Sequence, residues 1–501
     1  MKTNKKIVAI LLSLLCIGIA SAQINREKFG NYQDSIRQQY NKQQKDAQNK
    51  YKSELEKSRQ EYAEFRRKAN EEYAASLKKA WSATKMHIGE KPPVQPKPKT
   101  APSITKSPEP VFEPLPKPTV VPPPQPVEPA NIPEIPNPTP SSPTIQFFFY
   151  NTPCSVHASD DLRFRLASSE EKAVANAWKI LSSSKYDGLV HDCLELRKNL
   201  CLSDWGYLQL LQGMSYKLFG GEGNENVVLQ MYILTQSGIK VRLARSDTRL
   251  LLLIPFDNAI YSYSFITIDG EKYYAIDKNL SGGVVVCNVA YPGERVAHIA
   301  MLELPQLKYS PNPERNFISH KYSEIKLSVA TNKNLIDYLN NYPITGAWNC
   351  YTQASLSTQV KNALYPTLKS LLRGKSQKEA ANMLLDFLQT AFNYATDQDQ
   401  FGYERPLFGD ESFFYPQNDC EDRSILYSIL VHELLGLDVV MVNWPGHLAT
   451  AVCFTENVEG DYFSINGKRY VICDPTYIGA SVGMTMPQFK NTEAKIIQQY
   501  S

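Results

Sequence analysis

The chain has 501 residues, a formal net charge of +3 and 21% charged residues. At about 150 residues per domain, this length predicts two or three domains. The near-neutral balance argues against nucleic acid or an acidic polymer as the partner, and the hydrophobic content of 43% is sufficient for a buried core.

The first 22 residues have the pattern of a secretory signal peptide. Three lysines precede a short apolar run over 7–19, and Ala20-Ser21-Ala22 is an A-x-A cleavage site. We therefore predict an exported protein, periplasmic or extracellular, whose mature chain begins at Gln23. No later stretch is apolar over about 18 residues, so the mature chain is not expected to span a membrane. Export permits disulfides, but the sequence does not define their connectivity.

Residues 23–90 are predicted to form a long helix. Between 24 and 81 a row of aromatic residues recurs every 11 positions, and 11 residues per three turns is close to the period of a straight helix. The row consists of Phe29, Tyr40, Tyr51, Tyr62 and Tyr73. Two interpretations stay open: a solvated helix stabilised by i,i+4 charge pairs, or a helix that self-associates or docks through this row.

Residues 91–143 contain 20 of the chain's 33 prolines. This composition favours an extended, polyproline-II-like linker and disfavours a packed core. We therefore expect the helix and the linker to contribute no core to the rest of the chain, so that residues 23–143 can be removed without loss of the downstream fold.

From residue 144 the pattern predicts an α+β fold in two tandem copies, 144–320 and 321–501. Each copy has an amphipathic helix, a helix closed by glycine and followed by a strand, and a hairpin with Asp-Gly or Asn-Gly at its turn. These segments are 204–221, 224–246 and 261–278 in the first copy, and 376–396, 418–443 and 462–477 in the second. The last strand of each copy ends at an aspartate, Asp277 or Asp474.

The second copy carries residues suited to be a nucleophile, a base and an orienting acid. Cys420 is expected to open a helix, whose positive N-terminal end favours a thiolate. His447 opens a strand, and Asp474 closes the next strand. If these strands pair, His447 can take the thiol proton while Asp474 holds the other ring nitrogen.

Acidic residues flank this thiol and oppose its ionisation. Asp419 and Glu421 fit capping and helix-dipole complementation, which the sequence favours because it needs no metal. Alternatively, they bind a cation such as calcium. For an oxyanion, the backbone N–H of Cys420 is one expected donor, and the side chains of Gln417 and Trp444 are candidates for a second.

Three segments in this order resemble the transglutaminase-like superfamily of papain-fold cysteine enzymes: "NDCEDRSILYSILVHELLG", "GHLATAV" and "YVICDPTY". The resemblance implies a papain-like, transglutaminase-like fold with Cys420 as nucleophile, His447 as general acid/base and Asp474 as orienter. "DCED" is similar to the acid-flanked motif of bacterial transglutaminase-like periplasmic proteases. In some of these the acids bind calcium, which here implies Asp419 and Glu421.

The first copy lacks this chemistry. Alignment on the two helix-closing glycines places Glu222 opposite Cys420 or, with a small gap, Asn224, and no histidine lies between Asp257 and Asp277. We therefore expect a degenerate first copy, kept for structure or binding. The whole pattern predicts a secreted cysteine hydrolase acting on amide bonds of a protein or peptide. Acyl transfer to an amine, which is protein cross-linking, and a non-catalytic binding scaffold stay open as alternatives.

Overall fold

The computed structural model describes residues 3–89, 91, 112–122, 144–277 and 282–498, with the backbone alone for 3–36, 38 and 39. The chain divides into two units, residues 1–68 and 69–501. The predicted signal peptide falls on residues without described side chains. The predicted extended conformation of 92–111 and 123–143 lies outside the described residues, so both stay predictions.

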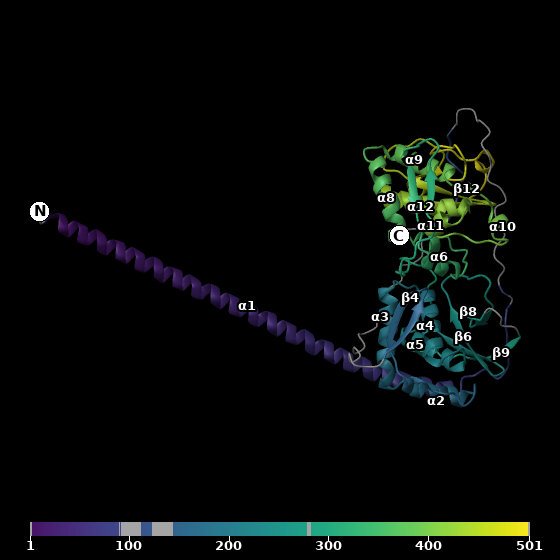
Figure 1. Ribbon diagram of the computed structural model, residues 1–501, viewed down its shortest axis with the longest axis horizontal. Coiled ribbons are helices and arrows are strands. Elements are labelled where there is room, and N and C mark those ends of the chain that lie inside the picture. Colours follow the sequence, from purple (N-terminus) through teal and green to yellow (C-terminus); the bar gives the residue numbers. More distant parts are fainter. Residues whose placement is uncertain (1–2, 90, 92–111, 123–143, 278–281, 499–501) are drawn as a thin grey trace. The chain divides into compact units, whose positions relative to one another are not determined.

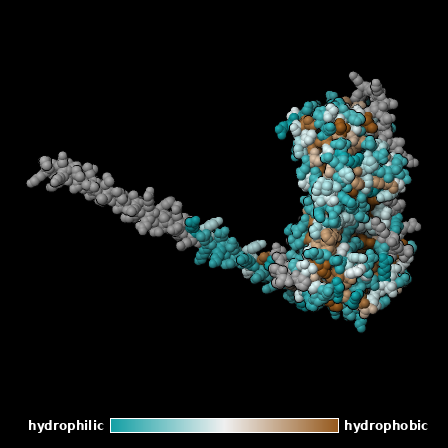
Figure 2. All heavy atoms as spheres, viewed as in Figure 1, coloured by the Kyte–Doolittle hydropathy of each residue, from teal (hydrophilic) through white to brown (hydrophobic). Residues whose placement is uncertain are grey.

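Helix α1 (Thr3–Leu77) is continuous, so the helix predicted over 23–90 ends earlier, at Leu77 (Figure 1). In the first unit it carries exposed i,i+4 pairs such as Lys57–Glu61, with Nζ 3.8 Å from Oε1. Tyr40 and Tyr51 are 64% and 66% exposed, and Figure 2 shows a mainly hydrophilic surface along this part of the helix. These features fit a solvated helix, whereas self-association through residues 24–81 stays a prediction. Among the described residues, no helix is both long and apolar enough to cross a bilayer.

The last turns of α1 belong to the second unit and are part of its core. Tyr73 is 4% exposed and packs on Trp178, with ring centroids 4.5 Å apart. Asn70 Oδ1 accepts hydrogen bonds from Trp178 Nε1 at 3.2 Å and from Gln236 Nε2 at 3.1 Å. The expectation that residues 23–143 contribute no core is therefore wrong here, because the aromatic row of the helix continues into the core at Tyr73.

Two short strands upstream of residue 144 extend the sheets of the second unit. β1 (Met86–His87) pairs antiparallel with β9 (Gly283–Cys287). β2 (Thr119–Val121), inside the proline-rich segment, pairs parallel with β18 (Lys495–Gln498). Residues 112–122 are thus not a free linker, because prolines that flank a short strand still allow it to pair along a sheet edge.

Two six-stranded sheets of the second unit share one strand order. Each half begins with an antiparallel hairpin, β3–β4 or β10–β11. The sheets have the orders β1-β9-β5-β6-β8-β7 and β2-β18-β14-β15-β17-β16. The remaining strands that form these hairpins and sheets are β3 (Thr144–Phe149), β4 (Thr152–His157), β5 (Arg242–Ser246), β6 (Arg249–Pro255), β7 (Phe265–Ile268), β8 (Glu271–Ala275), β10 (Arg315–Ile318), β11 (Lys326–Val329), β14 (Asp438–Trp444), β15 (His447–Cys453), β16 (Tyr462–Ile465) and β17 (Lys468–Cys473). The second hairpin begins at Arg315, upstream of the predicted boundary at 321.

Helices pack against these sheets, which confirms the predicted α+β class. α5 (Asn224–Gln236) packs on β6, and α12 (Cys420–Leu435) packs on β14 and β15. The other helices of eight or more residues in this unit are α2 (Glu171–Leu181), α3 (Asp187–Asn199), α4 (Asp204–Phe219), α6 (Lys333–Asn340), α8 (Thr358–Leu372) and α9 (Gln377–Thr390). The predicted hairpin turns are also confirmed: both residues of Asp269–Gly270 and of Asn466–Gly467 have positive φ.

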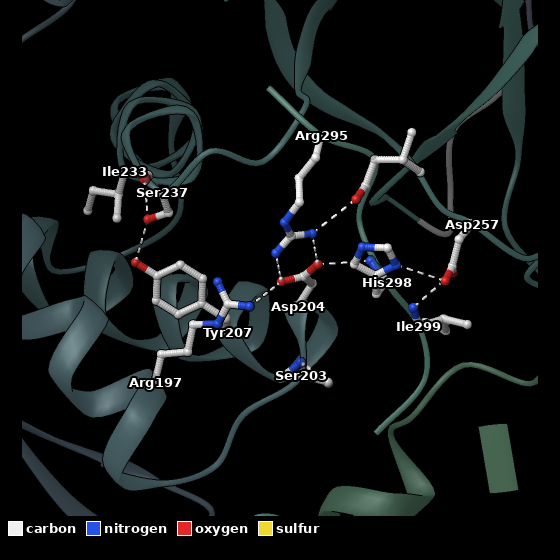
Figure 3. A network of polar contacts seen from close by, with 12 residues as sticks. Arg197, Ser203, Asp204, Tyr207, Ile233, Ser237, Asp257, Arg295, His298 and Ile299 are labelled. Carbon is white, nitrogen blue, oxygen red and sulfur yellow. Dashed lines mark hydrogen bonds and ion pairs between the residues drawn. The ribbon is translucent and has the colours of Figure 1, made fainter. Parts of the chain in front are cut away.

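A buried charge network fixes the start of α4 (Figure 3). Arg295 donates to Asp204 at 2.6 and 3.0 Å, Arg197 donates from the other side, and the backbone N–H of His298 donates at 2.8 Å. Burial opposes ionisation of Asp204, yet hydrogen bonding from Arg295 and the charge of Arg197 hold its pKa below the ordinary value. The network ties α4 to the segment that follows the first sheet.

The contributions of the two N-terminal parts can be separated by deletion. Removing residues 23–68 is expected to leave the melting temperature of the second unit unchanged. Removing residues 23–143 deletes Tyr73, Leu77, β1 and β2, and is expected to lower the free energy of unfolding by several kcal/mol. Truncating one buried leucine or aromatic side chain costs about 2–5 kcal/mol. Thermal unfolding followed by circular dichroism measures both fragments, and equal melting temperatures would contradict the packing of Tyr73 and Leu77.

Candidate active site

Cys420 is the first residue of α12, as the sequence predicts. Asp419 is the N-cap, in an extended conformation with φ −112°. The carboxylate of Asp422 accepts hydrogen bonds from the backbone N–H of Asp419 at 3.2 Å and of Leu407 at 2.8 Å. These bonds satisfy helix-end donors and fix where the helix begins. The thiol is 2% exposed and therefore sits beneath the surface.

His447 and Asp474 lie in direct contact. Nε2 of His447 is 2.8 Å from Oδ2 of Asp474, and both side chains are buried. β15 and β17 pair antiparallel with Thr450 opposite Cys473, which brings the start of one strand to the end of the other. Because Asp474 engages Nε2, the ring presents Nδ1 for proton transfer, as the sequence analysis expected.

Neighbouring groups hold this histidine–aspartate pair in place. Oδ1 of Asp474 accepts from the backbone N–H groups of Thr476 at 2.9 Å and Tyr477 at 3.1 Å. The imidazole of His447 stacks on Phe489, with centroids 5.2 Å apart and planes 8° apart. The ring and the carboxylate are therefore each oriented by a further partner.

The helix and the strand meet one turn beyond the thiol. Ser424 lies four residues after Cys420, on the same face of α12. Its Oγ donates to the carbonyl oxygen of Leu448 at 3.0 Å, and Leu448 follows His447 in β15. This bond aligns the first turn of α12 with the start of β15.

The thiol itself donates to an acid. Sγ of Cys420 is 3.2 Å from Oε2 of Glu421. This acid therefore competes with an imidazole for the thiol proton.

More charged residues surround the thiol than the sequence analysis identified. Asp397 and Glu404, from the segment before α12, bring carboxylate oxygens within 4.8 Å of oxygens of Asp419 or Glu421. Arg423 is 1% exposed and donates to the carbonyl oxygen of Phe392 at 2.7 Å. Burial lowers its pKa, which the charges of nearby groups including Asp419 oppose.

Asp397, Glu404 and Arg423 could not be assigned from spacing alone. Arg423 stands in the quoted motif, but a charged side chain on a helix is normally exposed. Asp397 and Glu404 lie more than ten residues upstream of the thiol and reach the acids beside it only through the tertiary fold.

Two groups of these acids could hold a cation. The oxygens of Asp397, Asp419 and Asp422 lie within 4.8 Å of one another, and so do those of Asp397, Glu404 and Glu421. Carboxylate oxygens are the ligands that calcium prefers. Asp422 also accepts two backbone N–H groups, as a capping residue does. Capping and a bound cation both stay open as the way in which these buried charges are neutralised.

Of the two side chains predicted as oxyanion donors, Trp444 is already hydrogen-bonded within the fold and Gln417 is still a candidate. The indole N–H of Trp444 donates to the carbonyl oxygen of Thr492 at 3.2 Å, so it is engaged in the fold. Gln417 lies half-buried in a two-residue strand, β13 (Gln417–Asn418), and stays a candidate. Asn418 was not predicted: it is 1% exposed, and neither side-chain atom has a hydrogen-bond partner among the described residues. Its amide is therefore a further donor close to Cys420.

A cavity of about 560 Å³ adjoins the site. Glu421 and Leu448, the chain neighbours of Cys420 and His447, line it, and Trp348 and Tyr261 contribute aromatic walls. Its volume is in the range of ligand-binding pockets. Cys420 and His447 are not among its lining residues, so a ligand in this cavity approaches the pair from the side.

The first half has different residues at the corresponding positions. Leu253 pairs with Ala275, and continuing this register gives Arg249 and Asp277 the same two-residue offset as His447 and Asp474 in the second half. Arg249 and Asp277 form an ion pair. The first copy therefore lacks the base, as predicted, and an arginine stands where the second copy has a histidine.

Asn224 takes the position of Cys420. It is the first residue of α5. Its Nδ2 donates to the carbonyl oxygen of Thr248, and its Oδ1 accepts from the backbone N–H of Leu250, both at 2.8 Å. The side chain that replaces the thiol thus joins the helix start to the β5–β6 turn.

A second histidine–aspartate pair in the first half is not the counterpart of the catalytic candidate. His298 Nδ1 is 2.9 Å from Asp257 Oδ2 (Figure 3). Asp257 follows the far end of β6, opposite the end where Arg249 lies. It also accepts from the backbone N–H of Ile299 at 3.1 Å, which indicates that the pair fixes a loop.

Comparison of the chain with protein-family models, with curated proteins and with solved structures finds no match. The structure brings His447 and Asp474 together, places Cys420 at the helix start, and groups Asp419 and Glu421 with further acids. The resemblance to the transglutaminase-like superfamily stays a prediction from the motifs.

Calcium is expected to stabilise the protein through these acids. An ion that binds only the folded state at about 100 times its Kd adds about 2.7 kcal/mol. The melting temperature should rise with calcium chloride and fall back with EDTA. The Asp419→Asn, Glu421→Gln variant should lose this response, and the matched control Asp160→Asn, Asp161→Asn should keep it. A melting temperature that does not respond to calcium would contradict this prediction. Helix capping and the charge of Arg423 would then have to neutralise these carboxylates.

Proposed function

We propose that the second copy is a transglutaminase-like, papain-fold cysteine hydrolase that cleaves amide bonds of a protein or peptide. The observation that carries this proposal is the buried contact between His447 Nε2 and Asp474 Oδ2, 2.8 Å long, next to a helix that begins with Cys420. Nucleophile, base and orienter are the three parts that acyl transfer through a thiol needs.

The reaction begins with proton transfer from the thiol of Cys420 to Nδ1 of His447. The sulfur then attacks the substrate carbonyl carbon, and the oxyanion receives the backbone N–H of Cys420 and an amide N–H from Asn418 or Gln417. The imidazolium of His447 returns the proton to the leaving nitrogen, the C–N bond breaks, and an acyl-thioester and a free amine result. Water, deprotonated by the imidazole, attacks the thioester and releases a carboxylic acid and the thiol.

Acyl transfer is the nearest variant of this reaction. An amine in place of water would give a new amide, and therefore cross-linking. A non-catalytic binding scaffold is the alternative from a different functional class. The first copy, which has neither the thiol nor the base, is the observation that favours this alternative. The charged groups at Cys420 favour the catalytic assignment, since perturbed ionisable clusters gather at functional sites.

We further propose that the protein acts outside the cytoplasm, in a periplasm or the extracellular space. The N-terminal pattern of basic residues, apolar run and A-x-A supports export. No disulfide joins the eight cysteines whose side chains the structure describes. Self-association through residues 24–81 would bring several catalytic units together, and the exposed rings of Tyr40 and Tyr51 are available for it.

Substitution of the nucleophile tests the proposal. Cys420→Ala is expected to reduce cleavage of a peptide library by on the order of 1,000-fold or more, because no other group forms the thioester. Cys453→Ala is the matched control, because this half-buried cysteine lies at the far end of β15 from His447. Mass spectrometry of the products measures both variants. Equal turnover by Cys420→Ala and the parent protein would refute the assignment.

The pH dependence of alkylation tests the thiol–imidazole pair. Iodoacetamide is expected to label Cys420 near pH 6 in the parent protein, because an imidazolium partner keeps the thiolate populated there. His447→Ala should suppress this labelling and shift it to higher pH. His432→Ala, at the C-terminal turn of α12, is the control and should behave like the parent. Peptide mapping resolves the labelled cysteine, and unchanged profiles would mean that His447 does not act on Cys420.

A further inference from the structure

A cleft lies between the two copies and reaches the candidate active site. Its inner part is the cavity of about 560 Å³ that Glu421 and Leu448 line. A second cavity of about 460 Å³ adjoins it. Six residues line both cavities: Tyr261, Thr345, Gly346, Trp348, Asn443 and Lys495. Each volume is in the range of ligand-binding pockets, so the cleft as a whole has room for several residues of a peptide.

The floor of the cleft is one face of the second sheet. Asn443 in β14 lies opposite Lys495 in β18, and Lys495 lies opposite Thr119 in β2. Residues paired in this way project to the same face of a sheet, and all three line the inner cavity. Two residues further along, the pair Val121 and Ile497 lines the outer cavity. The short strand within the proline-rich segment is therefore part of this floor.

The first copy and the segment after α6 form a wall of the cleft. The backbone N–H of Tyr261 donates to the carbonyl oxygen of Ile344 at 2.9 Å, and Ile260 forms a bridge with Thr345. These contacts hold a loop of the first copy against the second. Trp348 follows in the same segment, is half-buried and lines both cavities. The first copy thus helps to enclose the cleft that reaches the site of the second copy.

The accessible charges of the cleft are more acidic than basic. Glu493 is exposed and Glu404 is half-buried, whereas Glu421 is 1% exposed and lies deeper. Among the described residues that line the two cavities, Lys495 is the only base. The carboxylate of Glu493 accepts a hydrogen bond from Oγ1 of Thr119 at 3.2 Å, which holds it at the floor. This excess of carboxylates favours a ligand that carries positive charge.

A basic side chain of a peptide matches these groups. Its charged end can pair with Glu493 or Glu404, while its apolar stem packs along the ring of Trp348. The planar guanidinium of an arginine can also stack on the indole. An apolar side chain would leave the carboxylates unmatched, and an acidic side chain would be repelled by them.

We propose that this cleft binds a basic segment of the peptide substrate, with an arginine or lysine side chain held by Trp348 and Glu493. The proposal rests on the function proposed above, because it names the substrate class of the same site. The degenerate first copy then takes part in substrate recognition and leaves the chemistry to the second copy. Binding does not require the thiol, so a Cys420→Ala chain binds the peptide without turning it over.

Fluorescence anisotropy of labelled peptides with the full-length Cys420→Ala chain tests the cleft. Three peptides differ only in their central residue, which is arginine, glutamine or glutamate. EDTA is present, so that no metal ion competes at Glu404 and Glu421. The arginine peptide is expected to bind with a Kd of about 1 mM or below, and at least about tenfold more tightly than the glutamate peptide. Added salt should reduce this preference, because it screens charges near the surface.

Two further substitutions assign the preference to the cleft. Glu493→Gln removes an exposed carboxylate, and Trp348→Ala removes the ring. Each should weaken binding of the arginine peptide about threefold, whereas Glu493→Gln should leave the glutamine peptide nearly unchanged. Glu459→Gln, at an exposed glutamate that lines neither cavity, is the matched control and should bind as the Cys420→Ala chain does. Melting temperatures show that each variant is folded.

Equal affinity for the arginine and glutamate peptides would overturn the proposal. A preference for arginine that both Glu493→Gln and Trp348→Ala leave unchanged would place the peptide elsewhere and also overturn it. Arginine-selective binding that both substitutions weaken would support it, even if the parent chain cleaves no peptide of a library. That last result would count against the hydrolase alone, so the two proposals fail by different observations.

Discussion

Both halves depend on one antiparallel strand pairing, that of β6 with β8 in the first half and of β15 with β17 in the second half. In each half, the first residue of β6 or β15 lies diagonally across from a residue just after the end of its partner strand, β8 or β17. Long side chains can span this separation. In the second half these residues are His447 and Asp474. In the first half they are Arg249 and Asp277. One backbone arrangement therefore yields a buried histidine–aspartate pair in one copy and an arginine–aspartate ion pair in the other.

Electrostatics around the thiol follow from this frame. The N-terminus of α12 favours a thiolate, while Glu421 accepts the thiol hydrogen and favours the neutral form. Arg423 and any cation held by the acids act against Glu421. The ionisation of Cys420 thus depends on how many of the nearby carboxylates are matched by positive charge.

Local signals made much of this architecture predictable. Gly436 ends α12 with φ 66°, and Asn466–Gly467 forms the last hairpin turn, both as expected from residue type. The histidine–aspartate contact followed from strand order alone. Asp397 and Glu404 were not predictable, because they reach the acids beside the thiol through tertiary contacts that no spacing encodes. The strand within the proline-rich segment was also missed, since composition suggested an unpaired linker and the edge that it joins is formed by residues near the end of the chain.

The pairing of β2 with β18 also sets the order in which the fold can be completed. β2 is synthesised within the first quarter of the chain, whereas β18 lies within its last ten residues. The strand that covers the edge of the second sheet must therefore wait, unpaired, until translation is nearly finished. Long-range pairing of this kind is slow and leaves strands exposed to wrong partners. The prolines on either side of β2 limit it to three residues, so the waiting strand offers little to a neighbouring nascent chain.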